Sequence, residues 1–68
     1  MMIKLRVQEI LDEKGKTRYW LAKETGYSYQ NICNIVGNKT KQIRFETLEL
    51  FCGVLGCSVK DLFQESDH

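Results

Sequence analysis

The stretch from Thr17 to Gly37 spaces its small and apolar residues in a way that predicts two short helices joined by a tight turn. Gly26 can supply the positive φ that such a turn needs, and the small side chain of Ala22 allows the second helix to cross closely over the first. Apolar side chains at helical spacing would fill the angle between the two helices: Leu21, Ile32 and Ile35. This packing leaves few other folds open to the chain.

Both helices of this stretch begin after a residue that can cap them. Thr17 precedes a helix expected over residues 18–25, and Ser28 precedes a helix expected over residues 29–36. A serine or threonine oxygen at this position accepts a hydrogen bond from a backbone N–H that the helix leaves without a partner. Gly37 is expected to end the second helix.

The N-terminal part of the chain changes its pattern at residue 6. Ile3 and Leu5 alternate with charged residues, which predicts a short strand or an extended arm. Residues 6–14 then follow helical spacing, and Gly15 can end that helix in a left-handed conformation. The strand needs a partner, either the alternating apolar residues of the later loop or the same strand of a second subunit; the loop residues are Ile43 and Phe45.

After the polar loop 39–44, a fourth helix is expected to end at Gly56. Ser58 with Asp61 resembles a capping pair, with aspartate in place of the usual glutamate or glutamine, and predicts a last short helix. Residues 64–68 are expected to be a mobile tail. Helices this short persist in water when their apolar stripes share one core. The expected core is Val7, Ile10, Leu11, Leu21, Ala22, Tyr27, Ile32, Ile35, Leu48, Phe51, Leu55 and Leu62.

Taken together, these features resemble the DNA-binding domain of phage repressor and Cro proteins, the xenobiotic-response-element family, whose helix-turn-helix motif would span about residues 18–37. The likeness continues past the motif and covers nearly the whole chain, through Gly37 to Lys41, Thr47-Leu48, Leu55-Gly56 and Ser58 to Leu62. The resemblance implies an all-α fold of five helices, like that of lambda repressor, with a short N-terminal extended arm or strand.

The size and composition of the chain fit one such domain over residues 1–68. The chain has no proline, and it has neither a signal peptide nor an apolar run long enough to span a membrane, so we expect it in the cytoplasm. Its three cysteines form no Cys-x-x-Cys pair and its one histidine is His68. A metal site and a disulfide framework are therefore disfavoured, and we expect reduced thiols and no cofactor.

Charge is unevenly distributed along the chain. Residues 14–44 contain seven lysine and arginine residues against one glutamate, a net charge of +6, whereas residues 45–68 carry a net charge of −4. A solvated charged surface seldom segregates in this way. The basic segment coincides with the motif, which favours a nucleic-acid partner despite the overall charge of +1.

By resemblance, the helix over residues 29–36 would read bases in the major groove of double-stranded DNA. Gln30 and Asn34 carry amides that can bond adenine through its N6 and N7 atoms. Arg44 could enter a narrow minor groove or simply be solvated, and Arg18 stands where family members often have glutamine. The expected DNA contacts are Arg18, Ser28, Tyr29, Gln30, Asn34, Asn38, Lys39, Thr40, Lys41 and Arg44.

One small domain touches too little DNA for high specificity, so we expect a homodimer on a palindromic operator. The expected dimer surface is Leu50, Val54, Val59 and Phe63. The resulting hypothesis is a small transcriptional regulator, by default a repressor. An alternative is a helix-turn-helix-derived adaptor or antitoxin component, which would use exposed aromatic residues such as Tyr19 and Trp20. An enzyme is not expected, because the chain has no Ser-His or Cys-His set and no phosphate-binding glycine loop.

Overall fold

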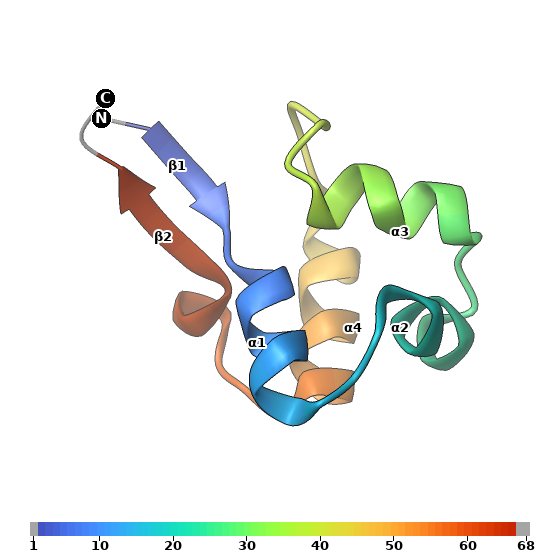
Figure 1. The fold of residues 1–68 in the computed structure, drawn as a ribbon. Helices are drawn as coiled ribbons and strands as arrows, with labels where there is room; N and C mark the ends of the chain where they lie inside the picture. Colours follow the sequence, from blue (N-terminus) through green and yellow to red (C-terminus); the bar gives the residue numbers. More distant parts are fainter. Residues whose placement is uncertain (1, 67–68) are drawn as a thin grey trace.

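The fold is known from a computed structural model that describes residues 2–66. In chain order, its elements are β1 (Met2–Leu5), α1 (Val7–Lys14), α2 (Arg18–Thr25), α3 (Tyr29–Val36), α4 (Phe45–Leu55), the 3-10 helix η1 (Val59–Leu62) and β2 (Phe63–Ser66). Figure 1 shows the two-stranded sheet of β1 and β2 at one end of the molecule and the helices α2 and α3 at the other, with α1 and α4 between them.

The two helices of the motif begin and end where the sequence predicts. The Thr17 side-chain oxygen accepts a hydrogen bond from the Trp20 N–H at 3.0 Å, and the Ser28 oxygen accepts one from the Asn31 N–H at 3.1 Å. Gly26 has a φ of 79°, in the left-handed region, which glycine adopts without the steric cost that a Cβ atom imposes. The predicted local signals therefore set the boundaries of α2 and α3.

The expected all-α fold of five helices is wrong in two respects. The described residues form four α-helices, and the last predicted helix is the four-residue 3-10 helix η1. Its backbone becomes extended at Phe63, with φ −115° and ψ 153°, because the chain leaves the helix there to pair with β1. The described fold also contains a two-stranded antiparallel sheet.

The N-terminal strand pairs with β2, which was not among its expected partners. In the sheet Ile3 lies opposite Glu65 and Leu5 lies opposite Phe63, so β1 is covered from within the same chain. Of the tail that we expected to be mobile, residues 64–66 belong to β2, and residues 67–68 lie outside the described part. This pairing brings the two ends of the described chain together (Figure 1).

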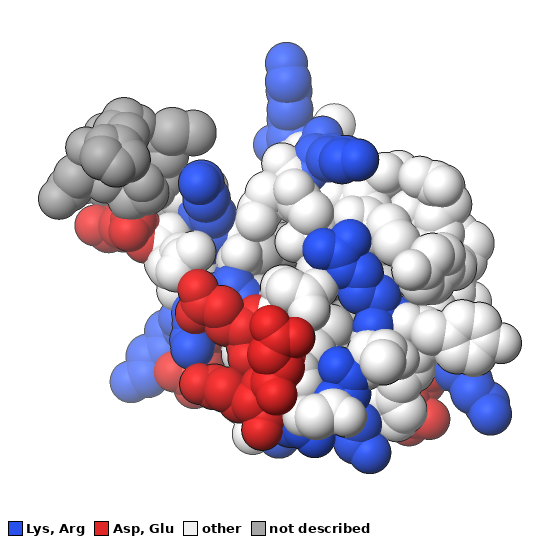
Figure 2. Space-filling model, in the orientation of Figure 1, with Lys and Arg blue, Asp and Glu red and all other residues white. Residues whose placement is uncertain are grey.

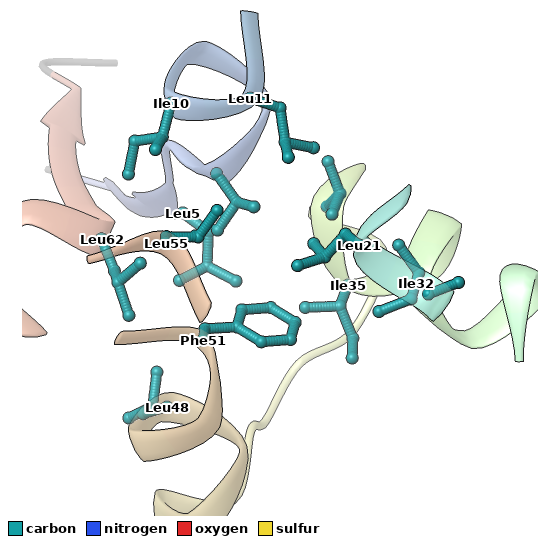
Figure 3. Packing of buried hydrophobic residues seen from close by; sticks show 13 residues of the cluster. Leu5, Ile10, Leu11, Leu21, Ile32, Ile35, Leu48, Phe51, Leu55 and Leu62 are labelled. Carbon is teal, nitrogen blue, oxygen red and sulfur yellow. The ribbon is translucent and has the colours of Figure 1, made fainter. Parts of the chain in front are cut away.

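One hydrophobic core joins all these elements. Every expected core residue is buried except Tyr27, which is half-buried and shares a hydrogen bond of 2.9 Å between its hydroxyl and that of the buried Thr47. Leu5 and Val36 complete the core. Figure 3 shows the ring of Phe51 pointing from α4 toward Ile35 of α3, and this core packing connects the two helices.

None of the helices between Met2 and Ser66 combines the length and the apolar character that crossing a membrane requires.

Candidate nucleic-acid interface

Helix α3 has one buried side and one side that faces solvent. Ile32, Ile35 and Val36 anchor it in the core. On its outer side Gln30 is exposed and Asn34 is half-buried, and the Gln30 Nε2 donates a hydrogen bond to the Asn34 Oδ1 at 3.2 Å. The two amides lie one helical turn apart and form a paired polar strip.

This strip has the chemistry for reading base edges. Each amide carries two N–H donors and a carbonyl acceptor, and the contact between Gln30 and Asn34 uses only one donor and one acceptor. The remaining groups can donate to and accept from the N7 and N6 atoms of adenine in the major groove. Both residues lie on the solvent-facing side of α3, and their contact with bases stays a prediction.

Two tyrosines extend this surface at the junction of α2 and α3. The rings of Tyr19 and Tyr29 lie 6.3 Å apart between centroids, and their exposed fractions are 70% and 53%. The pKa of Tyr29 is raised, first by its hydrogen bond with the Cys33 side chain. A tyrosine hydroxyl is protonated at neutral pH even at its ordinary pKa, so it can donate a hydrogen bond to a phosphate.

Trp20 lies differently from its neighbour Tyr19. Its ring is half-buried against the core, and the Lys16 Nζ lies 5.2 Å from the ring centroid. Such a contact between a cation and an aromatic face favours a fixed position for both side chains. Trp20 thus extends the core, whereas Tyr19 remains available on the surface.

Arg18 is held at the start of α2 by Gln8, which was not among the predicted site residues. The Arg18 Nε donates to the Gln8 Oε1 at 2.7 Å, and the Gln8 Nε2 donates to the Asp12 Oδ1 at 2.8 Å. The spacing of Gln8 and Asp12 predicts contact along one helix. The contact with Arg18 joins α1 to α2, so only the packing of these helices reveals it.

Asn38 has a structural role that was not predicted, and its phosphate contact stays untested. Its Oδ1 accepts a hydrogen bond from the Leu5 N–H at 2.8 Å, and its Nδ2 donates to the Leu5 carbonyl at 3.1 Å. Its φ of 59° is left-handed, a conformation that asparagine tolerates better than most residues. Both polar ends of the side chain are engaged with β1, so we leave Asn38 out of the proposed contacts.

The loop that follows α3 carries the other expected phosphate ligands. Lys39, Thr40 and Lys41 are exposed, and basic side chains project above this loop in Figure 2. Arg44 is also exposed, with its Nη1 3.3 Å from the Glu46 Oε1. Ser28 caps α3 with its oxygen, which leaves its hydroxyl proton free to be donated.

A hollow of about 380 Å³ lies between α3, this loop and the first turns of α4. Its lining includes the polar residues Asn31, Gln42 and Arg44. Asn31 and Gln42 were not among the predicted site residues, although Asn31 lies on the helix between Gln30 and Asn34. Polar side chains beside α3 add donors and acceptors at the edge of the proposed groove contact.

The opposite charge gathers away from this surface. Figure 2 shows acidic side chains over α1, where Glu9, Asp12 and Glu13 are exposed. Arg6 lies 3.3 Å from Glu9 and 3.9 Å from Glu13, which neutralises part of this patch. An acidic patch repels phosphates, so it favours an orientation in which α1 faces away from DNA.

The expected dimer surface is only partly exposed. Leu50, Val54 and Phe63 are half-buried, and the last two pack against the core. Val59, which is 50% exposed, instead lines a shallow hollow on the other flank of α4. We call this surface the apolar face and define it by Phe45, Leu48, Cys52 and Val59, with Glu49 at its edge. Phe45 is 84% exposed, although the sequence pattern suggests it only as a partner for β1.

Within residues 2–66 no group of three or more histidine, cysteine, aspartate or glutamate side chains is arranged to hold a metal ion. The polar groups that converge on the surface of α3 are instead amides, hydroxyls and cations.

A recognition helix held across a second helix, with amides on its outer side and cations beside it, defines the class of helix-turn-helix DNA-binding domains. The family model for the Cro/C1-type HTH DNA-binding domain matches residues 6–66, and the chain belongs to this family. The match covers all four α-helices, and it confirms the resemblance drawn from the sequence.

A solved structure supports the same assignment. The chain superposes on a candidate DNA-binding protein from Bacteroides fragilis with a TM-score of 0.82 and 28% sequence identity, over 93% of this chain and 100% of the other. A search of curated proteins finds no match.

Proposed function

We propose that this protein binds double-stranded DNA in a sequence-specific way and regulates transcription. The observation that carries the proposal is the strip of Gln30 and Asn34 on the outer side of α3, bonded to each other and to no other described side chain. In the proposed complex α3 lies in the major groove of the DNA, and α2 crosses the DNA backbone above it. The two amides read adenine, and Tyr29 contacts a thymine methyl or a phosphate.

Phosphate contacts hold the register of this complex without reading the sequence. Arg18 and Ser28 meet the backbone at the start of the motif, and Lys39, Thr40 and Lys41 meet it beyond α3. Arg44 reaches the adjoining minor groove after its exposed contact with Glu46 breaks. The description of the Bacteroides fragilis protein as DNA-binding agrees with this proposal.

The proposed active form is a homodimer on a palindromic operator. The apolar face supplies a surface for the second subunit, because Phe45 and Val59 expose apolar area there that a monomer leaves in water. Two α3 helices about one turn of DNA apart would double the contacts with bases. Repression follows from occlusion of a promoter, which requires DNA binding alone.

Selection of bound duplexes from a random DNA pool at near-physiological salt tests this function. The expected result is a palindromic sequence motif whose half-sites contain adenine at the positions that face Gln30 and Asn34. A pool that shows no enrichment would contradict the proposal and favour the adaptor or antitoxin alternative. A variant in which both amides are changed to alanine is the control, because it should retain binding to phosphate and lose the enrichment.

A further inference from the structure

Two cysteines meet where α4 ends. Helix α4 stops at the left-handed Gly56, and the Cys57 N–H donates to the Cys52 carbonyl at 3.2 Å. The Gly56 N–H donates to the same carbonyl at 2.8 Å. In this type of helix end the residue after the glycine folds back, and its side chain often packs against the residue that accepts the bond. The two residues at these positions are Cys52 and Cys57, and their thiols lie within hydrogen-bond reach of each other.

The backbone bond also limits how far apart the two cysteines can lie. With standard bond lengths, a distance of 3.2 Å between the Cys57 nitrogen and the Cys52 oxygen keeps the two Cα atoms within about 7 Å. Disulfides span Cα separations of about 4.4–6.8 Å. The backbone can therefore hold a disulfide at this turn with little movement.

The surroundings agree with two thiols side by side. Both side chains are half-buried and pack against the core. Burial raises the pKa of the Cys57 thiol, the nearby Cys52 thiol and Asp61 carboxylate raise it further, and the Lys14 ammonium lowers it. Cys33 lies on α3, apart from this turn, and serves as an internal reference.

We propose that Cys52 and Cys57 form a reversible disulfide with small-molecule disulfides such as oxidised glutathione as the oxidant. A protein thiolate attacks one sulfur of the oxidant, so a mixed disulfide forms and one small thiolate leaves. The second cysteine loses its proton and attacks the protein-bound sulfur, which forms the bond between Cys52 and Cys57 and releases the second small thiol. Two protein thiols are oxidised, and one small disulfide is reduced to two thiols.

The test is equilibration of the full chain with mixtures of reduced and oxidised glutathione near pH 8, where thiolates are accessible. Free thiols are then alkylated, and intact masses and linked peptides are measured without reduction. The expected product has one alkylated cysteine, Cys33, and a mass lower by two hydrogen atoms for the linked pair. Three glutathione adducts, or a bond that includes Cys33, would overturn the proposal.

Variants separate the pair from the third cysteine. Cys33→Ser should form the same disulfide and leave no thiol to alkylate, whereas Cys57→Ser should yield glutathione adducts alone. The native chain should also form the bond at a lower ratio of oxidised to reduced glutathione than the same chain in denaturing guanidinium. If the denatured chain formed it at an equal or lower ratio, the fold would not favour the pair, and the inference would fail.

Discussion

Gln30 presents an amide to solvent on the first turn of α3, where a base edge would lie in the proposed complex. Gln30→Ala should lose about 1–3 kcal/mol of binding at one base position and relax specificity there, because it removes one direct contact. Lys41→Ala should weaken binding to every sequence and reduce the salt slope by about one unit. Binding measured against operators with single substitutions, at several salt concentrations, distinguishes the two. A uniform loss for Gln30→Ala would contradict the placement of α3.

Asn38 connects the end of α3 to the backbone of Leu5. Asn38→Gly keeps the left-handed backbone conformation accessible but removes both hydrogen bonds. The free energy of unfolding should therefore fall by about 1–3 kcal/mol. In a domain of this size each kcal/mol lowers the Tm by about 4–8 °C. Thermal unfolding measures this change, with Gln64→Ala as an exposed control. Unchanged stability with weakened DNA binding would instead support a phosphate contact.

Asp61 accepts hydrogen bonds from the Ser58 hydroxyl at 2.9 Å and the Ser58 N–H at 3.3 Å. These bonds hold its pKa below the ordinary value. The ionised carboxylate therefore stabilises the folded state, and this stabilisation is complete above about pH 4, where the carboxylate is ionised in the unfolded chain as well. The stabilisation is lost as the pH falls through the pKa of the folded state. Asp61→Ala should therefore be less stable than the parent protein at neutral pH and equal to it in strong acid. Thermal unfolding across that range checks the difference, with Glu24→Ala as the control. A constant difference at all pH values would exclude this role.

At the scale of the elements, the hydrogen-bonding pattern of the sheet formed by β1 and β2 can be tested with proline substitutions. The Arg6 N–H donates to the Leu62 carbonyl, whereas the Leu5 N–H turns away from β2 and donates to Asn38. Opposed pairs alternate along an antiparallel ladder between hydrogen-bonded and non-hydrogen-bonded. The next hydrogen-bonded pair is therefore Lys4 with Gln64, and Ile3 with Glu65 is a non-hydrogen-bonded pair.

Gln64→Pro should remove a bond of the ladder, whereas the matched Glu65→Pro replaces an N–H that points away from β1. Gln64→Pro should be less stable by at least about 1 kcal/mol in denaturant unfolding. Equal losses for the two variants would show that this register is not the one in solution.

At the scale of the whole molecule, the apolar face should control assembly. Phe45→Glu places a charge on it and should weaken self-association by about tenfold or more in sedimentation equilibrium. Ile3→Glu is the matched control, since Ile3 is also an exposed apolar side chain but lies on β1. Equal weakening by the two variants, or a monomer on the operator, would exclude the apolar face as the dimer surface.

The parts of the fold that depend on local interactions could be predicted from the sequence. The bounds of α2 and α3, their caps at Thr17 and Ser28, and the turn at Gly26 follow from hydrogen bonds and backbone preferences within a few residues. The core stripes follow from helical periodicity in the same way. Gln30 and Asn34 could be named as candidate contacts because helical spacing places them on the outer side of α3, and their contact with bases stays a prediction.

Only the tertiary structure decided what joins residues that are distant in the sequence. The partner of β1, the contact of Asn38 with Leu5, and the contact of Gln8 with Arg18 each connect different elements, and periodicity carries no information about such contacts. The apolar face likewise depends on η1 packing beside α4. Spacing along one helix shows which residues share a side of it, but whether that side is covered depends on how all the elements pack together.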